Sequence, residues 1–298
     1  DPLKLIKLEA DRVIVSAPGF KIDLLMSKYK SLIEDAFYNV MGFNVELEII
    51  PEENIPKDNP ENIKDSSSES SSIRNEKFTF NNFVVGPSNK FAYTASLRVA
   101  ENPGSVFNPV FIYGNSGLGK THLLNAIIEK IKSNNPDATI LYTTSEDITN
   151  DLYFAIQTKT THDLHQKYRT CDALLIDDIQ MIAGKTQTEE EIFHTFDTLI
   201  KAGKQIVLTS DKPPSAIPKI EDRLKTRFES GLLCDIQPPD FETRVAIIKD
   251  KANYLRFELP DDVCSFIAEN IKSNVRQMGS AVKNIYAYCS FNNVIPTV

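Results

Sequence analysis

The chain has 298 residues, 41% of them hydrophobic, which is enough for one substantial core and a smaller second domain. Its net charge of −8 excludes a protein whose whole surface binds nucleic acid through positive charge, so any DNA contact must be local. Because it has no apolar run near the ~20 residues of a membrane span, no signal peptide and no CxxC pair among its four cysteines, we expect a cytoplasmic protein without disulfides or a zinc site.

Residues 1–50 predict a small α/β domain. Alternating apolar residues predict strands at 3–8, 12–16 and 45–49, and an apolar helical face runs from Phe20 to Phe37. The chain begins inside the first strand without an initiator Met, so we expect this domain to be incomplete. Residues 51–77 contain three prolines, six serines and few apolar residues, which predicts a flexible linker.

From residue 78 the pattern alternates short apolar strands with amphipathic helices. This alternation predicts a parallel sheet covered on both faces, over residues 78–238. The expected strands are 110–113, 139–142, 173–176, 205–208 and 232–236. After Pro239 only helical stripes follow, at 241–255 and 275–289, so residues 239–298 should form a helical subdomain.

The sequence GNSGLGKT, Gly114 to Thr121, follows the first of these strands and opens a helix. It matches the phosphate-binding pattern G-x-x-x-x-G-K-[ST], in which the glycines let backbone N–H groups turn around phosphate oxygens. Lys120 would reach the β and γ phosphates, and Thr121 would hold Mg²⁺. A glycine-rich turn that only links strand to helix is the alternative, which the strand, loop and helix in register disfavour.

Aspartates stand at the ends of two further predicted strands. In ALLIDD, Asp177 would bind Mg²⁺ through water and Asp178 would orient the attacking water, although two aspartates can also mark a strand end. In QIVLTSD, Asp211 could reach the γ-phosphate, or it could cap a helix before the Pro213-Pro214 turn.

Two arginines in EDRLKTRF, Arg223 and Arg227, lie four residues apart on one predicted helical face, without an acidic partner at the same spacing. An arginine presented in this way can serve the γ-phosphate of a neighbouring subunit as a finger. Solvated surface arginines are the alternative, and the spacing leaves both open.

Residues 80–298 resemble the AAA+ domain of the bacterial replication initiator DnaA family. FNNFVVGPSN, NPVFIYGNSGLGKTHLL, ALLIDDIQ, EEIFHTF, VLTSD, EDRLKTRF, ETRVAIIKDKA and SNVRQMGSAV all stand in the expected order. Residues 1–50 resemble part of the family's KH-like amino-terminal domain, which mediates self-association and helicase contact. The resemblance implies an α/β AAA+ fold with a helical lid, and a family helix-turn-helix domain that would follow Val298.

The resemblance also assigns roles to single residues. Asp177 and Asp178 become Walker B, Asp211 sensor 1, Arg227 the arginine finger and Arg223 an assembly-supporting residue. Arg276, off the apolar stripe of the last helix, becomes the sensor 2 arginine that reaches the nucleotide from the lid. The ATP- or ADP-binding set comprises Val84 and Val85 at the adenine, Gly114, Asn115, Ser116, Gly117, Leu118, Gly119, Lys120 and Thr121 of Walker A, and the adjoining His122.

The family holds single-stranded DNA through an apolar residue and basic residues, and here those places carry Tyr153, Lys185 and Gln187. Lys185 keeps the cation and Tyr153 could stack on a base, but Gln187 removes a charge. Further partners that the resemblance implies are other copies of the chain, origin DNA, the replicative helicase and acidic phospholipids.

Together these features predict an ATP-dependent replication initiator that oligomerises on origin DNA and promotes strand opening and helicase loading. Hydrolysis would switch it off, slowly, because Asp-Asp stands where faster AAA+ motors carry Asp-Glu. A helicase-loader ATPase is the first alternative. A monomeric P-loop kinase and a scaffold with a dead nucleotide site are the others.

Overall fold

The computed structural model describes residues 4–8, 12–17, 46–51, 78–292 and 294–298, and the chain divides into two units, Asp1–Ile73 and Arg74–Val298. The first unit contains a three-stranded sheet of β1 (Lys4–Leu8), β2 (Arg12–Ala17) and β3 (Glu46–Pro51), in that order. β1 and β2 are antiparallel, whereas β2 and β3 are parallel. The three strands are where the sequence predicts them. The helix expected at 20–37 and the linker beyond Pro51 lie outside the described residues.

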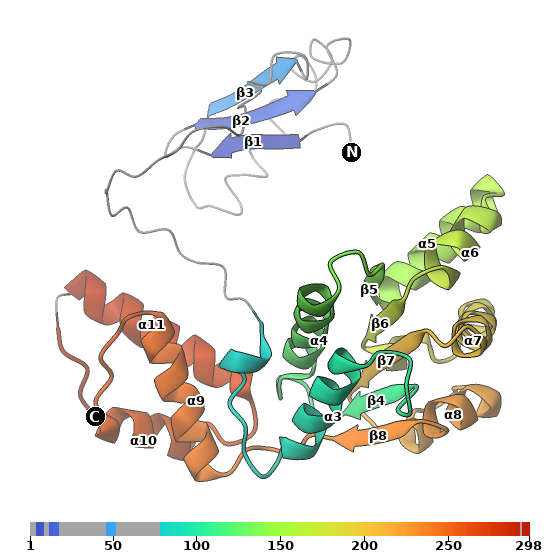
Figure 1. The fold of residues 1–298 in the computed structure, drawn as a ribbon. Helices are drawn as coiled ribbons and strands as arrows, with labels where there is room; N and C mark the ends of the chain where they lie inside the picture. Colours follow the sequence, from blue (N-terminus) through green and yellow to red (C-terminus); the bar gives the residue numbers. More distant parts are fainter. Residues whose placement is uncertain (1–3, 9–11, 18–45, 52–77, 293) are drawn as a thin grey trace. The chain divides into compact units, whose positions relative to one another are not determined.

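The second unit is built on a five-stranded sheet in which every pairing is parallel (Figure 1). Its strands are β4 (Val110–Tyr113), β5 (Ile140–Thr144), β6 (Ala173–Asp177), β7 (Gln205–Ser210) and β8 (Leu232–Asp235), in the order β5-β6-β7-β4-β8. The order places the end of β4 between the ends of β7 and β8. All five predicted strands are confirmed, with ends that differ by at most two residues.

Helices cover both faces of this sheet, as the alternating pattern predicts (Figure 1). Phe111 of β4 points into one core, and its neighbours Val110 and Ile112 point into the other. The helices over the face of Val110 are α3 (Lys90–Glu101) and α4 (Lys120–Asn134). The helices over the face of Phe111 are α5 (Ser145–Thr158), α6 (Thr161–Arg169), α7 (Thr186–Lys201) and α8 (Asp222–Glu229). The short helices η3 (Phe80–Asn82), η4 (Ile179–Ile182) and η5 (Pro214–Ala216) complete this part.

A helical subdomain of α9 (Phe241–Tyr254), α10 (Asp261–Asn270) and α11 (Val275–Asn292) follows the sheet. These helices share a core of their own. In α9 the predicted stripe is confirmed at Ile248 and Ala252, which are buried together with Ile247, whereas Phe241 stays 37% exposed at the first turn. In α11 Met278 and Val282 are buried, as expected.

The four cysteines are buried and free. Burial raises the pKa of Cys171 to about 11 and that of Cys234 to about 12, so both thiols stay protonated and act as small apolar groups. Within the part of the chain that the structure describes, no helix is long and apolar enough to cross a membrane.

The aromatic centre of one core gives a stability test. Phe228 is fully buried, with its ring centroid 5.5 Å from that of Phe111 and 5.7 Å from that of Phe196. We expect Phe228→Ala to lower the free energy of unfolding by about 3–5 kcal/mol in urea denaturation, because a cavity replaces the ring. Phe154→Ala, at a side chain that is 64% exposed, is the control and should change it by less than about 0.5 kcal/mol. Equal effects would contradict the packing described.

Candidate nucleotide-binding site

The phosphate-binding loop connects β4 to α4. Gly117 and Gly119 have φ values of 80° and 102°, in the left-handed region that favours glycine. A Cβ on Gly117 would lie 2.3 Å from Oδ1 of Asn274, so a side chain there would also push against the helical subdomain. The loop therefore needs glycine at this position for two independent reasons.

Lys120, at the start of α4, is only 6% exposed. Its amino group donates to the carbonyl oxygens of Gly114 at 2.6 Å and Asn115 at 3.2 Å, and it forms an ion pair with Oδ1 of Asp211 at 2.6 Å. The carboxylate of Asp211 thus faces the loop. It does not cap η5, whose N-cap residue is Pro213.

Asp177, at the end of β6, accepts hydrogen bonds from three hydroxyl groups. Thr121 donates to Oδ2 at 2.7 Å, Tyr142 donates to the same oxygen at 3.2 Å, and Thr209 donates to Oδ1. Burial, together with the charge of Asp177, raises the pKa of Tyr142 to about 12, so the phenol remains a donor at neutral pH. The carboxylate is thereby fixed in the direction of the loop.

The hydroxyl of Thr121 and the carboxylate of Asp177 are oxygen donors of the kind that Mg²⁺ prefers. Among the described residues no group of three or more His, Cys, Asp or Glu could hold a metal by itself. Mg²⁺ usually takes its remaining ligands from water and substrate phosphates, so these two residues fit a metal that arrives with a nucleotide.

Asp178 lies in the left-handed region, with φ 54°, and its side chain is exposed while that of Asp177 is buried. Its backbone N–H donates to Oγ1 of Thr209 at 3.0 Å. Gln180 donates to Oδ1 of Asp178 at 3.2 Å and accepts from the backbone N–H of Asp211 at 3.3 Å. One amide side chain therefore links the carboxylate of Asp178 to the backbone of Asp211.

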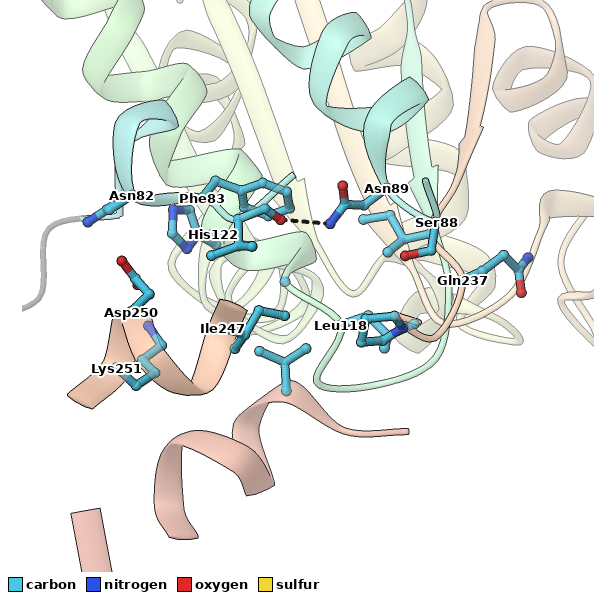
Figure 2. A pocket seen from close by; sticks show the side chains of 15 residues that line it. Asn82, Phe83, Ser88, Asn89, Leu118, His122, Gln237, Ile247, Asp250 and Lys251 are labelled. Atoms are coloured by element: carbon cyan, nitrogen blue, oxygen red, sulfur yellow. Dashed lines mark hydrogen bonds between the residues drawn. The ribbon is translucent and has the colours of Figure 1, made fainter. Parts of the chain in front are cut away.

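A pocket opens beside the loop, between the sheet subdomain and the helical subdomain (Figure 2). It encloses about 480 Å³, open solvent included. In Figure 2 the α9 side chains of Ile247, Asp250 and Lys251 face those of Phe83 and His122 across it. Its lining residues are Asn82, Phe83, Val84, Ser88, Asn89, Leu118, Gly119, His122, Ile236, Gln237, Pro239, Ile247, Asp250, Lys251 and Val275.

Of the two valines predicted at the adenine, Val84 lines the pocket, whereas Val85 does not and is 43% exposed. Asn89 fixes this segment, because its amide donates to the carbonyl of Val84 at 3.0 Å (Figure 2). It also accepts from the N–H of Gly86 at 2.9 Å. The predicted His122 also lines the pocket.

The helical subdomain is attached to the loop itself. The N–H of Val275, at the start of α11, donates to the carbonyl of Gly117 at 3.0 Å. Asn274 accepts the N–H of Arg276 at 2.9 Å, which caps this helix start. Arg276 is exposed on the first turn of α11, off the buried stripe, as predicted.

The two arginines of α8 lie elsewhere and have acidic partners that their spacing did not predict. Arg227 forms an ion pair with Asp197 of α7 at 2.8 Å, and Arg223 forms one with Glu221 at 2.5 Å. Both guanidinium groups lie over the ring of Phe193. None of these residues lines the pocket.

The residues considered for single-stranded DNA lie on α5 and at the start of α7. Lys185 is the N-cap residue of α7, and its amino group donates to Oγ1 of Thr149 on α5 at 3.3 Å. Tyr153 follows Thr149 by one helical turn and is 66% exposed. Gln187 is exposed in the first turn of α7.

Tyr142 and Gln180 are the contacts at this site that the sequence did not indicate. Tyr142 lies in β5, whose residue Thr144 pairs with Asp177, so its long side chain can reach along the sheet to that carboxylate. The reach depends on strand order, which neither residue's local pattern reveals.

A parallel sheet in the order β5-β6-β7-β4-β8, a phosphate-binding loop after β4, carboxylates after β6 and β7, and a helical subdomain at the pocket define an AAA+ P-loop protein. Residues 74–235 match the family described as the bacterial DnaA ATPase domain. The chain belongs to this family. The predicted family and the predicted α/β AAA+ fold of the second unit are thereby confirmed, whereas the KH-like likeness of residues 1–50 stays a prediction.

Solved structures agree. Domain III of the replication initiation protein DnaA from Thermotoga maritima is 43% identical, with a TM-score of 0.72, over 75% of this chain and 93% of that one. AMPPCP-bound DnaA from Aquifex aeolicus is 39% identical, with a TM-score of 0.67, over 71% of this chain and 65% of that one. A replication initiator DnaA bound to AMPPCP and single-stranded DNA is 38% identical, with a TM-score of 0.67, over 71% and 65%. The chain thus spans about two thirds of these last two structures.

The hydroxyl of Thr209 gives a test of the site's construction. Thr209→Val keeps the shape but leaves the Asp178 N–H without its acceptor and Asp177 without one donor. We expect a loss of about 1–3 kcal/mol in the free energy of unfolding, measured in urea. Thr209→Ser keeps the hydroxyl and should lose less than half as much. Equal losses in both variants would show that the methyl group contributes as much as the hydroxyl, which would contradict the role given to the two hydrogen bonds.

Proposed function

We propose that this protein is an ATP-dependent initiator of chromosomal replication, which assembles with other copies on origin DNA in its ATP form. The observation that carries the proposal is that the phosphate-binding loop touches three parts of the molecule at once. Lys120 contacts Asp211, Thr121 contacts Asp177, and Gly117 contacts the lid at Val275. A nucleotide bound here can therefore change how sheet and lid are held together.

ATP would enter the pocket with its base near Val84 and Leu118 and its phosphates on the loop. Lys120 would exchange its contact with Asp211 for phosphate oxygens, since both are anionic partners of one ammonium group. Thr121 and Asp177 would hold Mg²⁺, which supplies charge neutralisation at the phosphates. Arg276 would approach from the lid.

For hydrolysis, a water molecule held by Asp178 would attack the γ-phosphorus as the bond to the β-phosphate oxygen breaks and ADP leaves. Asp178 would accept the proton of that water. Its carboxylate is already engaged by Gln180 and is one methylene shorter than a glutamate, so turnover should be slow. Hydrolysis would then act as an off-switch for the assembly.

The domain roles belong to the same proposal. Residues 78–238 bind the nucleotide and 239–298 form its lid, while residues 1–50 contact the helicase and 51–77 connect the two parts. Tyr153 and Lys185 would hold single-stranded DNA, as a related DnaA was solved with single-stranded DNA bound. Duplex origin DNA would be read by a helix-turn-helix domain following Val298. Contact with acidic phospholipids and a cytoplasmic location complete the proposal.

A helicase-loader ATPase is the second candidate, because it would share the phosphate-binding loop and the arginine finger. It would not depend on a tethered amino-terminal domain. Deleting residues 1–77 and measuring helicase recruitment separates the two, since only the initiator should lose recruitment.

Self-assembly is tested at Arg227. We expect the chain to sediment as an oligomer with ATP and as a monomer with ADP, and Arg227→Ala to remain monomeric with either, because its guanidinium would contact the γ-phosphate bound to a neighbour. Lys120→Ala, without nucleotide binding, should behave like Arg227→Ala. Lys132→Ala, at the far end of α4, is the control and should assemble. Oligomers of Arg227→Ala with ATP would contradict the finger, and assembly left unchanged by Lys120→Ala would favour a scaffold with a dead nucleotide site.

The switch is tested by single-turnover hydrolysis. The hydrolysis rate should stay below about one per second, the low end of enzyme turnover, because hydrolysis would serve only to end the ATP-bound assembly. A rate of many per second, typical of a motor, would contradict the switch.

A further inference from the structure

Arg227 is held by a residue to which nothing above gives a function. Asp197 lies on α7, 26% exposed, and its Oδ1 accepts from Nη2 of Arg227 at 2.8 Å. The Arg227 side chain is 44% exposed, and its guanidinium lies 5.6 Å from the ring centroid of Phe193, one turn before Asp197 on the same helix. The arginine is therefore fixed by a carboxylate at one nitrogen and by an aromatic ring.

This arrangement leaves donors of the guanidinium free. A guanidinium carries five N–H donors, and among the described residues Asp197 is the only ion-pair partner of this one. The neighbouring Arg223 is held differently, through Nε, by Glu221 on its own segment. Both arginines lie over Phe193, but only Arg227 forms an ion pair with a residue of α7 among the described residues.

Asp197 has two opposing effects on how Arg227 would bind a neighbour's γ-phosphate, one electrostatic and one entropic. Its negative charge repels an incoming phosphate, but Lys201, one turn later on α7, lies 3.7 Å from Oδ2 and compensates much of that charge together with Arg227. Against this, an unrestrained arginine loses considerable rotamer freedom when it binds, and a preformed contact removes that loss in advance. Because the charge is compensated and the group is partly exposed, orientation should outweigh repulsion.

We propose that Asp197 is a positioning residue for the arginine finger: it holds Arg227 by Nη2 so that the remaining N–H groups face the γ-phosphate of a nucleotide bound to a second copy of this chain. The proposal rests on the proposed function, since it needs a neighbour to receive the finger. The inference goes beyond the proposed function because it names the residue that sets the direction of the Arg227 side chain.

The test uses mixed pairs, so that finger and nucleotide site come from different protomers. Lys120→Ala protomers serve as fluorescent donors, with an intact finger and no nucleotide, and Arg227→Ala protomers serve as acceptors, with an intact site and no finger. Donor–acceptor association is measured by sedimentation with ATP. Asp197→Asn, which removes the charge and keeps the shape, is added either to the donor or to the acceptor.

We expect Asp197→Asn in the donor to weaken ATP-dependent association about threefold to fivefold, the range that couplings of partly exposed ion pairs imply. The same change in the acceptor should have no effect. A merely structural role of Asp197 would instead weaken association from either protomer. Asp197→Glu in the donor should restore part of the association. Asp172→Asn, which breaks the ion pair of Asp172 with Lys204, is the matched control and should have no effect in either protomer.

Unchanged or tighter association with Asp197→Asn in the donor overturns the positioning role. An equal loss of association when Asp197→Asn is placed in the acceptor also overturns it. Melting temperatures of all variants are compared to show that the fold is retained. If the unmodified chain itself does not associate with ATP, the proposed function fails and this inference fails with it. If the unmodified chain associates, Arg227→Ala abolishes the association and Asp197→Asn in the donor leaves it unchanged, the proposed function stands and Asp197 is excluded.

Discussion

The carboxylate of Asp177 is the point at which the segments of the site meet. It is 6% exposed and accepts hydroxyl hydrogen bonds from β5, α4 and β7, through Tyr142, Thr121 and Thr209. A buried carboxylate without such donors would be costly, so the position of each donor is constrained by the others. The Asp177 carboxylate thereby holds the ends of β5 and β7 and the start of α4 close together. The same carboxylate is the proposed metal ligand. Folding and function impose the same geometry here.

The lid is the second constraint. Sheet and lid have separate cores, yet the first turn of α11 binds the phosphate loop through Val275 and packs Asn274 against Gly117. The pocket is formed between these two bodies. A nucleotide in the pocket would touch both subdomains. In the proposed function it could therefore change the position of the lid relative to the sheet by direct contact.

The sequence predicts the parts of this structure that depend on local pattern. The loop from Gly114 to Thr121 and the aspartates after β6 could be found because the glycines, the lysine and the apolar strands are all contiguous. Tyr142 and Gln180 could not be found, since their roles depend on which strands are neighbours. The partner of Arg227 was missed for the same reason: Asp197 is thirty residues away in sequence, and only the packing of α7 against α8 brings it to the guanidinium. Val84 and Val85 show another limit of local pattern, since two neighbouring valines do not reveal which side chain lines the pocket, and in the structure it is that of Val84.

The contact between Lys120 and Asp211 has a further consequence. An ammonium group buried beside the loop already has a counter-ion of its own, so phosphate binding is an exchange of one anion for another and not the filling of a bare positive site. In the proposed function, the displaced carboxylate would be released as the γ-phosphate arrives, beside the place where the attacking water would lie. The charge of Lys120 is thus balanced by Asp211 in this structure, and in the proposed function nucleotide binding would set free a second acid–base group next to the bond to be broken.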